Sequence, residues 1–208
     1  MKFIYAFGSI CRGELDIYSD IDLLLVTDDK GKTNEDLLLK FSVYNFKTLR
    51  DLWLEGNPFA WHLHKEARLI FSLDGNDVIK EMGTPNDYKN GVKDCQKFYA
   101  IFLDAVDSIN DGMETKVFDL GTIFLAIRNF ATCFGVHHLN VHSFSRRSAL
   151  QIGDYSLKIE HDNYLLLERA RVLSTRGKGE ALTVTEIKKV ETNLGAINAW
   201  FLKLLKLM

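Results

Sequence analysis

A Gly-Ser pair at positions 8 and 9 is followed, after a gap of ten residues, by two aspartates spaced i and i+2. This pairing constrains the fold more than any other feature of the chain. The apolar run 3–7 before it is typical of a buried strand, and Gly8 and Ser9 break that run where a turn should follow. Glycine lets the main chain approach an anion closely, while backbone N–H groups and the Ser9 hydroxyl can donate to phosphate oxygens. The first half of the pattern therefore predicts a phosphate-binding turn.

The second half of the pattern predicts a metal site at the start of a strand. The run Asp20–Val26 reads as a strand in which side chains alternate between faces, so Asp20 and Asp22 share one face and Ile21 points into the core. Two carboxylates so placed can hold a hard divalent cation, with water and triphosphate oxygens completing its coordination. The plainer alternative is a polar strand entry beside a common loop dipeptide, because Asp, Gly and Ser are all frequent in turns. The fixed spacing of the two halves favours the site.

These residues resemble a known family, the small nucleotidyltransferases of the DNA polymerase β superfamily, which carry Gly-Ser, ten residues and Asp-x-Asp. The resemblance covers residues 1 to about 73 and includes the step Arg12-Gly13-Glu14 and the run 19–23, Ser-Asp-Ile-Asp-Leu. It implies an α/β (α+β) nucleotidyltransferase domain with a short mixed sheet. It also implies a Mg²⁺-dependent (or Mn²⁺-dependent) enzyme. Such an enzyme transfers a nucleoside monophosphate, most often AMP, from a nucleoside triphosphate to an acceptor hydroxyl and releases pyrophosphate.

The resemblance also implies roles for five residues. Asp20 and Asp22 would be the catalytic metal ligands, and Gly8 and Ser9 would hold the β and γ phosphates. Arg12 would neutralise phosphate charge and count as nucleotide-binding. For Arg12, a salt bridge is an equally good interpretation.

One element of the family pattern is missing. These enzymes usually bring a third carboxylate from the neighbouring strand, but the expected third strand, residues 41–46, contains no acid. A general base must then come from elsewhere, because catalysis needs a carboxylate or histidine within reach of the acceptor hydroxyl. The candidates are Glu66, His62, His64 and the acids Glu114, Asp119, Glu160 and Glu168. The alternative hypothesis is a catalytically degenerate nucleotide-binding partner, or antitoxin-like protein, of the same fold.

Downstream, the sequence predicts a second domain made of helices. Residues 1–76 form the predicted nucleotidyltransferase domain, the polar segment 77–93 a linker, and 94–208 an α-helical bundle of four amphipathic helices. The last of these helices is expected over 185–205. An α/β half followed by a bundle resembles kanamycin-type nucleotidyltransferases and nucleotidyltransferases paired with helical HEPN partners, in which the bundle lines the acceptor side. An active HEPN ribonuclease is disfavoured, since Arg128 stands too far from His137 and His138.

Composition adds expectations about compartment and partners. The 208 residues carry a net charge of −2, which gives no global attraction to nucleic acid. Three scattered cysteines argue against a disulfide framework or a zinc site. No segment is expected to reach membrane-spanning length, and with no visible leader the predicted location is cytoplasmic. The acceptor, whether a small molecule, a protein or an RNA hydroxyl, stays open, as does the choice between a homo-oligomer and a toxin-like partner protein.

Overall fold

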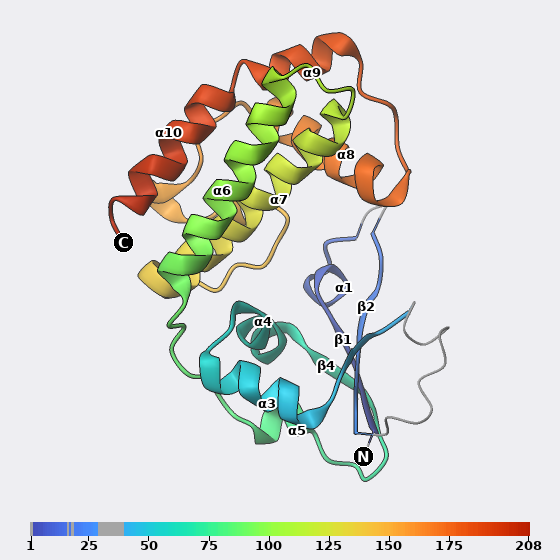
Figure 1. Ribbon diagram of the computed structural model, residues 1–208. Helices are drawn as coiled ribbons and strands as arrows, with labels where there is room; N and C mark the ends of the chain where they lie inside the picture. The colour runs from blue at the N-terminus through green and yellow to red at the C-terminus, as the bar shows by residue number, and fades with distance from the viewer. Residues whose placement is uncertain (1, 16, 18, 29–39) are drawn as a thin grey trace. The chain divides into compact units, whose positions relative to one another are not determined.

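The computed structural model describes residues 2–15, 17, 19–28 and 40–208. The chain divides into two compact units, residues 1–89 and 90–208 (Figure 1). In order, the first unit contains β1 (Lys2–Phe7), α1 (Ser9–Arg12), β2 (Asp22–Thr27), β3 (Ser42–Tyr44), α3 (Phe46–Glu55), α4 (Pro58–Glu66), β4 (Arg68–Ser72) and α5 (Val78–Glu81). A small sheet followed by a largely helical region confirms the predicted fold class.

The sheet of the first unit has the strand order β3-β2-β1-β4. β1 runs antiparallel to β2 and to β4, whereas β2 and β3 run parallel, so the sheet is mixed as expected. Helices α3, α4 and α5 gather on one side of it (Figure 1). Phe3, Tyr5 and Phe7 alternate along β1 and are buried beneath these helices. The apolar period of two in β1 thus decides which face of the sheet the helices cover.

Local capping sets the limits of the two longer helices. The Asn45 side chain accepts a hydrogen bond from the Thr48 N–H at 2.7 Å and starts α3, and Gly56 ends it in a left-handed conformation. Asn57 then caps α4, with Pro58 in its first turn. These residues therefore form the break between the two helices, through ordinary N-cap and C-cap chemistry.

The segment after β4 differs from the expected linker over 77–93. Val78 and Ile79 of α5 are buried in the core of the first unit. The Tyr5 hydroxyl donates to Asp77 Oδ1 at 3.0 Å and accepts from the Ile79 N–H at 3.3 Å. Residues up to 89 thus belong to the first unit, and the next helix begins at Gly91. Short apolar pairs inside a polar stretch gave no periodicity from which this packing could be predicted.

The second unit is helical. It contains α6 (Gly91–Asn110), α7 (Lys116–Phe134), the π-helix Gly135–Leu139, two short 3₁₀ segments (Ser148–Leu150 and Gly153–Tyr155), α8 (His161–Arg176), α9 (Val184–Glu191) and α10 (Leu194–Leu205). The single helix expected over 185–205 is therefore two helices. Thr183 and Glu186 form a capping box at the start of α9, and Thr192 is its C-cap.

Helix α7 forms the core of this unit and packs against both α6 and α8. Its Gly121 lies so close to α8 that a Cβ there would come within 2.4 Å of Ser174 Oγ. Together with the π-helix, α7 makes a 24-residue helical segment that contains an 18-residue window with a mean hydropathy of 1.4, so by length and composition it could cross a membrane. The expectation that no segment reaches that length is thus wrong. Of this 18-residue window, 61% is buried inside the unit, as in the core helix of a globular domain.

Candidate active site

The turn after β1 joins the two halves of the sequence pattern. Gly8 has φ 75° and ψ −147°, a conformation that side-chain-bearing residues rarely adopt. A Cβ built on Gly8 would lie 2.3 Å from Asp22 Oδ2, well inside van der Waals contact. Glycine is therefore required twice here, by the backbone conformation and by the carboxylate that lies against it. Ser9 follows at the first position of α1 and is only 8% exposed.

The two aspartates lie in different local structures. Asp22 is the first residue of β2 and pairs with Phe7 in the antiparallel ladder, so it shares the helix-covered face with Phe7. Asp20 precedes the strand and is exposed, and Ile21 is 58% exposed. The predictions that the strand begins at Asp20 and that Ile21 enters the core are wrong, because strand pairing starts two residues later. The alternation of side chains along β2 therefore determines which face Asp22 points to, but it does not apply to Asp20, which precedes the strand.

The chemistry of the pair still fits a triphosphate-bound divalent cation. Within the part of the chain that the structure describes, no group of three or more His, Cys, Asp or Glu is arranged to hold a metal ion. Mg²⁺ is commonly held by one or two carboxylates together with substrate phosphates and water, and not by an all-protein cage. Asp20 and Asp22 can supply that number of ligands, with a triphosphate on the Gly8 turn supplying the others.

Arg12, at the end of α1, forms ion pairs with two glutamates. Its Nε donates to Glu14 Oε2 at 2.8 Å, and its Nη1 donates to Glu66 Oε2 of α4. Burial alone would lower the pKa of Arg12, but the contacts with Glu14 and Glu66 outweigh burial and raise it. These pairs support the salt-bridge interpretation of Arg12. A direct contact between Arg12 and phosphate stays a prediction.

Glu66 also holds His62 one helical turn earlier. His62 Nε2 lies 2.9 Å from Glu66 Oε2, and the His62 ring packs edge-on against Phe7, with ring centroids 5.4 Å apart. Desolvation would raise the pKa of Glu66, but the hydrogen bond from His62 and the charge of Arg12 hold it below its usual range. Glu66 is therefore ionised at neutral pH. Since Phe7 is the ladder partner of Asp22, α4 brings this histidine to the Gly8 end of the sheet.

The other base candidates have different surroundings. His64 packs against Trp61 with centroids 5.9 Å apart, and burial, with the charge of Lys65, lowers its pKa. In the helical unit, Asp119 is buried and accepts hydrogen bonds from the hydroxyls of Ser108 and Thr115. Glu168 faces Arg146, and Glu160 faces Lys189. Within the first unit, Glu66 pairs with Arg12 and His62 packs against Phe7, so these two candidates contact the Gly8 turn region and its strand.

Cys11 was not identified from the sequence as a site residue. Burial raises the pKa of its thiol, and the charges of Arg68, Glu66, Arg12 and Asp22 also act on it. The thiol therefore stays protonated amid the charged groups of the site. No local pattern distinguishes this cysteine, because most of the charges that surround it come from other parts of the chain.

The neighbouring strand contains no acid, as the sequence predicts. β3 pairs with β2 in parallel register, Leu24 opposite Ser42 and Val26 opposite Tyr44. Two residues earlier along each chain come Asp22 and the exposed Lys40. The position level with Asp22, where a third carboxylate would complete a metal site, is thus occupied by Lys40, and the strand that follows contains no acid.

Comparison with known proteins agrees with this geometry. Residues 1–76 match the family model described as polymerase beta, nucleotidyltransferase. A search among curated proteins finds no significant match to the chain. The first unit is therefore a nucleotidyltransferase domain of the DNA polymerase β superfamily, and the resemblance inferred from Gly8, Ser9, Asp20 and Asp22 is confirmed at the level of the family.

Proposed function

We propose that the chain is a nucleotidyltransferase that uses Mg²⁺ (or Mn²⁺) to transfer a nucleoside monophosphate from a nucleoside triphosphate to an acceptor hydroxyl. The observation that carries this proposal is the contact between the Gly8 turn and the Asp22 carboxylate. It brings a phosphate-binding turn and a cation ligand to one point, which is the arrangement that a metal-bound triphosphate requires. ATP as the donor follows from the family resemblance and is part of the proposal, as is a cytoplasmic location.

The residues of the site divide the work between them. Asp20 and Asp22 would hold the cation, which when bound would neutralise charge on the triphosphate and polarise it toward attack. Gly8 lets phosphate oxygens approach the main chain, and the Ser9 hydroxyl donates a hydrogen bond to one of them. Arg12 fixes the position of Glu66 through its ion pair.

His62 is the proposed general base in place of the missing acid. If the His62 Nε2–H donates to Glu66, the Nδ1 atom is the proton acceptor, and the ionised carboxylate stabilises the imidazolium that forms. The acceptor oxygen bonds to the α-phosphorus, its proton moves to Nδ1, and the bond from the α-phosphorus to the bridging oxygen breaks. Pyrophosphate then leaves with that oxygen.

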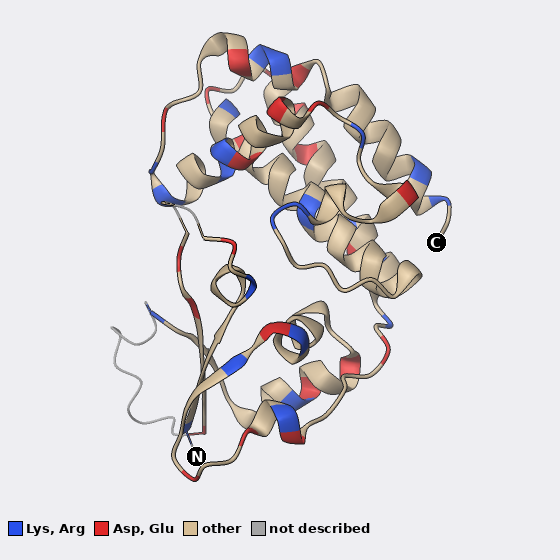
Figure 2. Ribbon diagram, turned by 180° about the vertical axis from the view of Figure 1, so that it is seen from behind, with Lys and Arg blue, Asp and Glu red and all other residues tan. Residues whose placement is uncertain are grey.

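The alternative is a nucleotide-binding protein that has lost turnover and acts as an antitoxin-like partner. The absence of an acid from β3 favours it. Lys and Arg are interspersed with Asp and Glu along the ribbon of both units (Figure 2). Charge therefore favours none of the acceptor classes: small molecule, protein or RNA.

Thermal unfolding with and without a triphosphate and Mg²⁺ tests the binding step. A ligand at a hundredfold excess over its Kd stabilises the folded state by about 2.7 kcal/mol. The wild type should show this gain and the double variant Asp20→Ala/Asp22→Ala should not. A matched control, Asp51→Ala/Glu55→Ala, removes two exposed acids from α3 and should behave as the wild type. Equal shifts in all three proteins would contradict the metal site.

Transfer of label tests turnover. The purified protein is incubated with each labelled nucleoside triphosphate, Mg²⁺ or Mn²⁺, and a cell extract, and the labelled fraction identifies the acceptor class. His62→Ala should lower the rate by about 10² or more while leaving triphosphate binding unchanged. Triphosphate binding without any transfer, by the wild type and with every extract, would instead favour the antitoxin-like alternative.

A further inference from the structure

The first unit carries three arginines, and the structure gives each of them a different environment. They are Arg12 on α1, Arg50 on α3 and Arg68 at the start of β4. An arginine that binds phosphate needs two properties. Its guanidinium must lie near the phosphate-binding turn, and its donors must not already be engaged by carboxylates. These two conditions separate the three side chains.

Arg12 lies near the Gly8 turn, but its charge is already paired. Its guanidinium contacts both Glu14 and Glu66, two carboxylates for one positive charge. The Arg12 and Glu66 side chains are only 19% and 11% exposed, so a phosphate that took Arg12 would leave a largely buried carboxylate without this partner. Removing one partner of a buried ion pair is strongly destabilising. Arg12 is therefore better suited to hold Glu66 than to bind phosphate.

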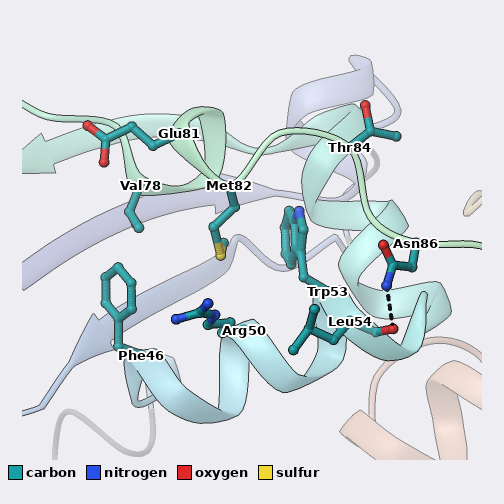
Figure 3. A pocket seen from close by; sticks show the side chains of 9 residues that line it. All are labelled: Phe46, Arg50, Trp53, Leu54, Val78, Glu81, Met82, Thr84 and Asn86. Carbon is teal, nitrogen blue, oxygen red and sulfur yellow. Dashed lines mark hydrogen bonds between the residues drawn. The ribbon is translucent and has the colours of Figure 1, made fainter.

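Arg50 is exposed but lies far from the turn. Its side chain borders a recess between α3 and α5 (Figure 3), and within the described residues no carboxylate pairs with it. Phe46 borders the same recess and packs against Phe3, near the start of β1, with ring centroids 6.4 Å apart. Phe7, which precedes the Gly8 turn, lies about 13 Å along that strand from Phe3. Arg50 thus lies toward the opposite end of the sheet.

Arg68 lies at the same end of the sheet as the turn. It is the first residue of β4 and pairs with Ala6 of β1, which comes two residues before Gly8. Its charge also reaches α1, which begins at Ser9. Burial raises the pKa of the Cys11 thiol on α1, and among the charges that act on this pKa the strongest is that of Arg68, which lowers it. The strand register and the effect on Cys11 agree in placing the Arg68 guanidinium beside α1.

Most of the donors of Arg68 are not engaged. Its Nη1 donates to the main-chain carbonyl oxygens of Ala67, at 3.1 Å, and Glu66, at 3.5 Å, which limits the rotation of the guanidinium. In the part of the chain that the structure describes, no carboxylate pairs with Arg68, and its Nε and Nη2 donate no hydrogen bond. These two atoms form one edge of the guanidinium, and such a two-donor edge matches two oxygens of a phosphate group. Because Arg68 is exposed, a ligand can reach this edge.

We propose that Arg68 is the arginine that binds the triphosphate, through hydrogen bonds from Nε and Nη2 to oxygens of the β and γ phosphates. This role rests on the proposed function, because it needs a triphosphate on the Gly8 turn. Gly8 and Ser9 hold these phosphates from the turn, and Arg68 reaches them from β4. The same contact stabilises pyrophosphate as it leaves, since negative charge grows on it when the bond to the α-phosphorus breaks.

Isothermal titration calorimetry of the full chain with a non-hydrolysable ATP analogue and with inorganic pyrophosphate, each with Mg²⁺, tests the role of Arg68. Arg68→Gln should weaken the binding of both ligands by about tenfold or more, because it removes two charge-assisted hydrogen bonds. Arg68→Lys keeps the charge but not the two-donor edge, so its affinities should lie between those of the wild type and Arg68→Gln.

Two matched controls separate this contact from a general loss of positive charge. Arg50→Gln removes the same charge from an exposed arginine toward the other end of the sheet, and it should bind both ligands as the wild type does. Arg12→Gln should lower the free energy of unfolding, because Glu66 loses a partner, but it should change ligand affinity less than Arg68→Gln does. Circular dichroism verifies that each variant is folded.

The possible outcomes distinguish the role of Arg68 from the proposed function. If the wild type does not bind the ATP analogue, the triphosphate site itself is wrong, and the role of Arg68 is overturned with it. If the wild type binds and Arg68→Gln loses no more affinity than Arg50→Gln, the triphosphate site stands and only the role of Arg68 is overturned. A larger loss in Arg12→Gln than in Arg68→Gln would also overturn it and would assign the phosphate contact to Arg12.

Discussion

Replacing Gly8 with alanine tests the central contact of the site, and the structure gives the size of the effect. The backbone at Gly8, φ 75° and ψ −147°, costs a residue with a side chain about 1 to 3 kcal/mol. The new methyl group would also lie 2.3 Å from Asp22 Oδ2, so the carboxylate must move away from the turn. We expect Gly8→Ala to lower the free energy of unfolding of the first unit by about 2 to 3 kcal/mol. We also expect it to weaken binding of a triphosphate with Mg²⁺ by more than about tenfold, which corresponds to about 1.4 kcal/mol.

Gly13→Ala is the matched control. Gly13 also has positive φ, 70°, but with ψ 18° it lies in the ordinary left-handed region, and a Cβ there meets nothing within 4 Å. Its replacement should cost only about 1 kcal/mol of conformational strain and should leave Asp22 where it is. The difference between the two variants therefore isolates the contact between the turn and the carboxylate.

Urea unfolding followed by tryptophan fluorescence measures stability, with Trp53 and Trp61 reporting on the first unit and Trp200 on the second. Fluorescent-nucleotide titration at fixed Mg²⁺ measures affinity. If Gly8→Ala and Gly13→Ala lose the same stability and both keep their affinity, Gly8 is only a structural turn and the reasoning is refuted.

Three further expectations follow from other parts of the structure. Because the pKa of Glu66 is lowered in the folded state, its stabilising contribution is complete above the unfolded value of about 4.3 and is lost as pH falls through the folded value. Glu66→Gln should thus be less stable than the wild type at pH 7 and as stable as the wild type in acid. The control Glu14→Gln changes the more exposed partner of Arg12 and should alter stability little. Urea titrations at several pH values measure both variants. Ser42→Asp should raise transfer in the label assay if the missing third acid limits turnover. Thr183→Ala removes the cap of α9 and should cost about 1 kcal/mol, measured by circular dichroism during urea unfolding.

Short-range chemistry explains what the sequence could predict. The β1 strand, the Gly8 turn and the break between α3 and α4 each depend on residues within a few positions of one another. The family resemblance likewise rests on a local pattern, and the match over residues 1–76 confirms it. The absence of an acid from β3 was predictable directly from the residue types of the segment 41–46.

Contacts between distant residues explain what the sequence could not predict. Arg12 and Glu66 are 54 positions apart, and Tyr5 and Asp77 are 72 apart, so neither pair gives a local signal. The Tyr5 hydroxyl draws the segment after β4 onto the first unit, where a polar composition predicted a linker. Similarly, the pairing register of β2, which only the folded sheet determines, leaves Asp20 outside the strand.

Under the proposed function, the missing third acid bears on proton transfer and not on triphosphate binding. Two carboxylates and a glycine turn suffice to bind a cation with a triphosphate, because the ligand supplies the remaining oxygens. A missing third acid therefore leaves binding intact in both the enzyme and the antitoxin-like hypothesis, and no binding measurement can separate them. They differ only in whether another group accepts the proton of the acceptor hydroxyl. Transfer by the wild type therefore distinguishes the two. If transfer occurs, its loss in His62→Ala at unchanged triphosphate affinity would identify the proton acceptor as His62, which contacts Glu66 and packs against Phe7, the ladder partner of Asp22.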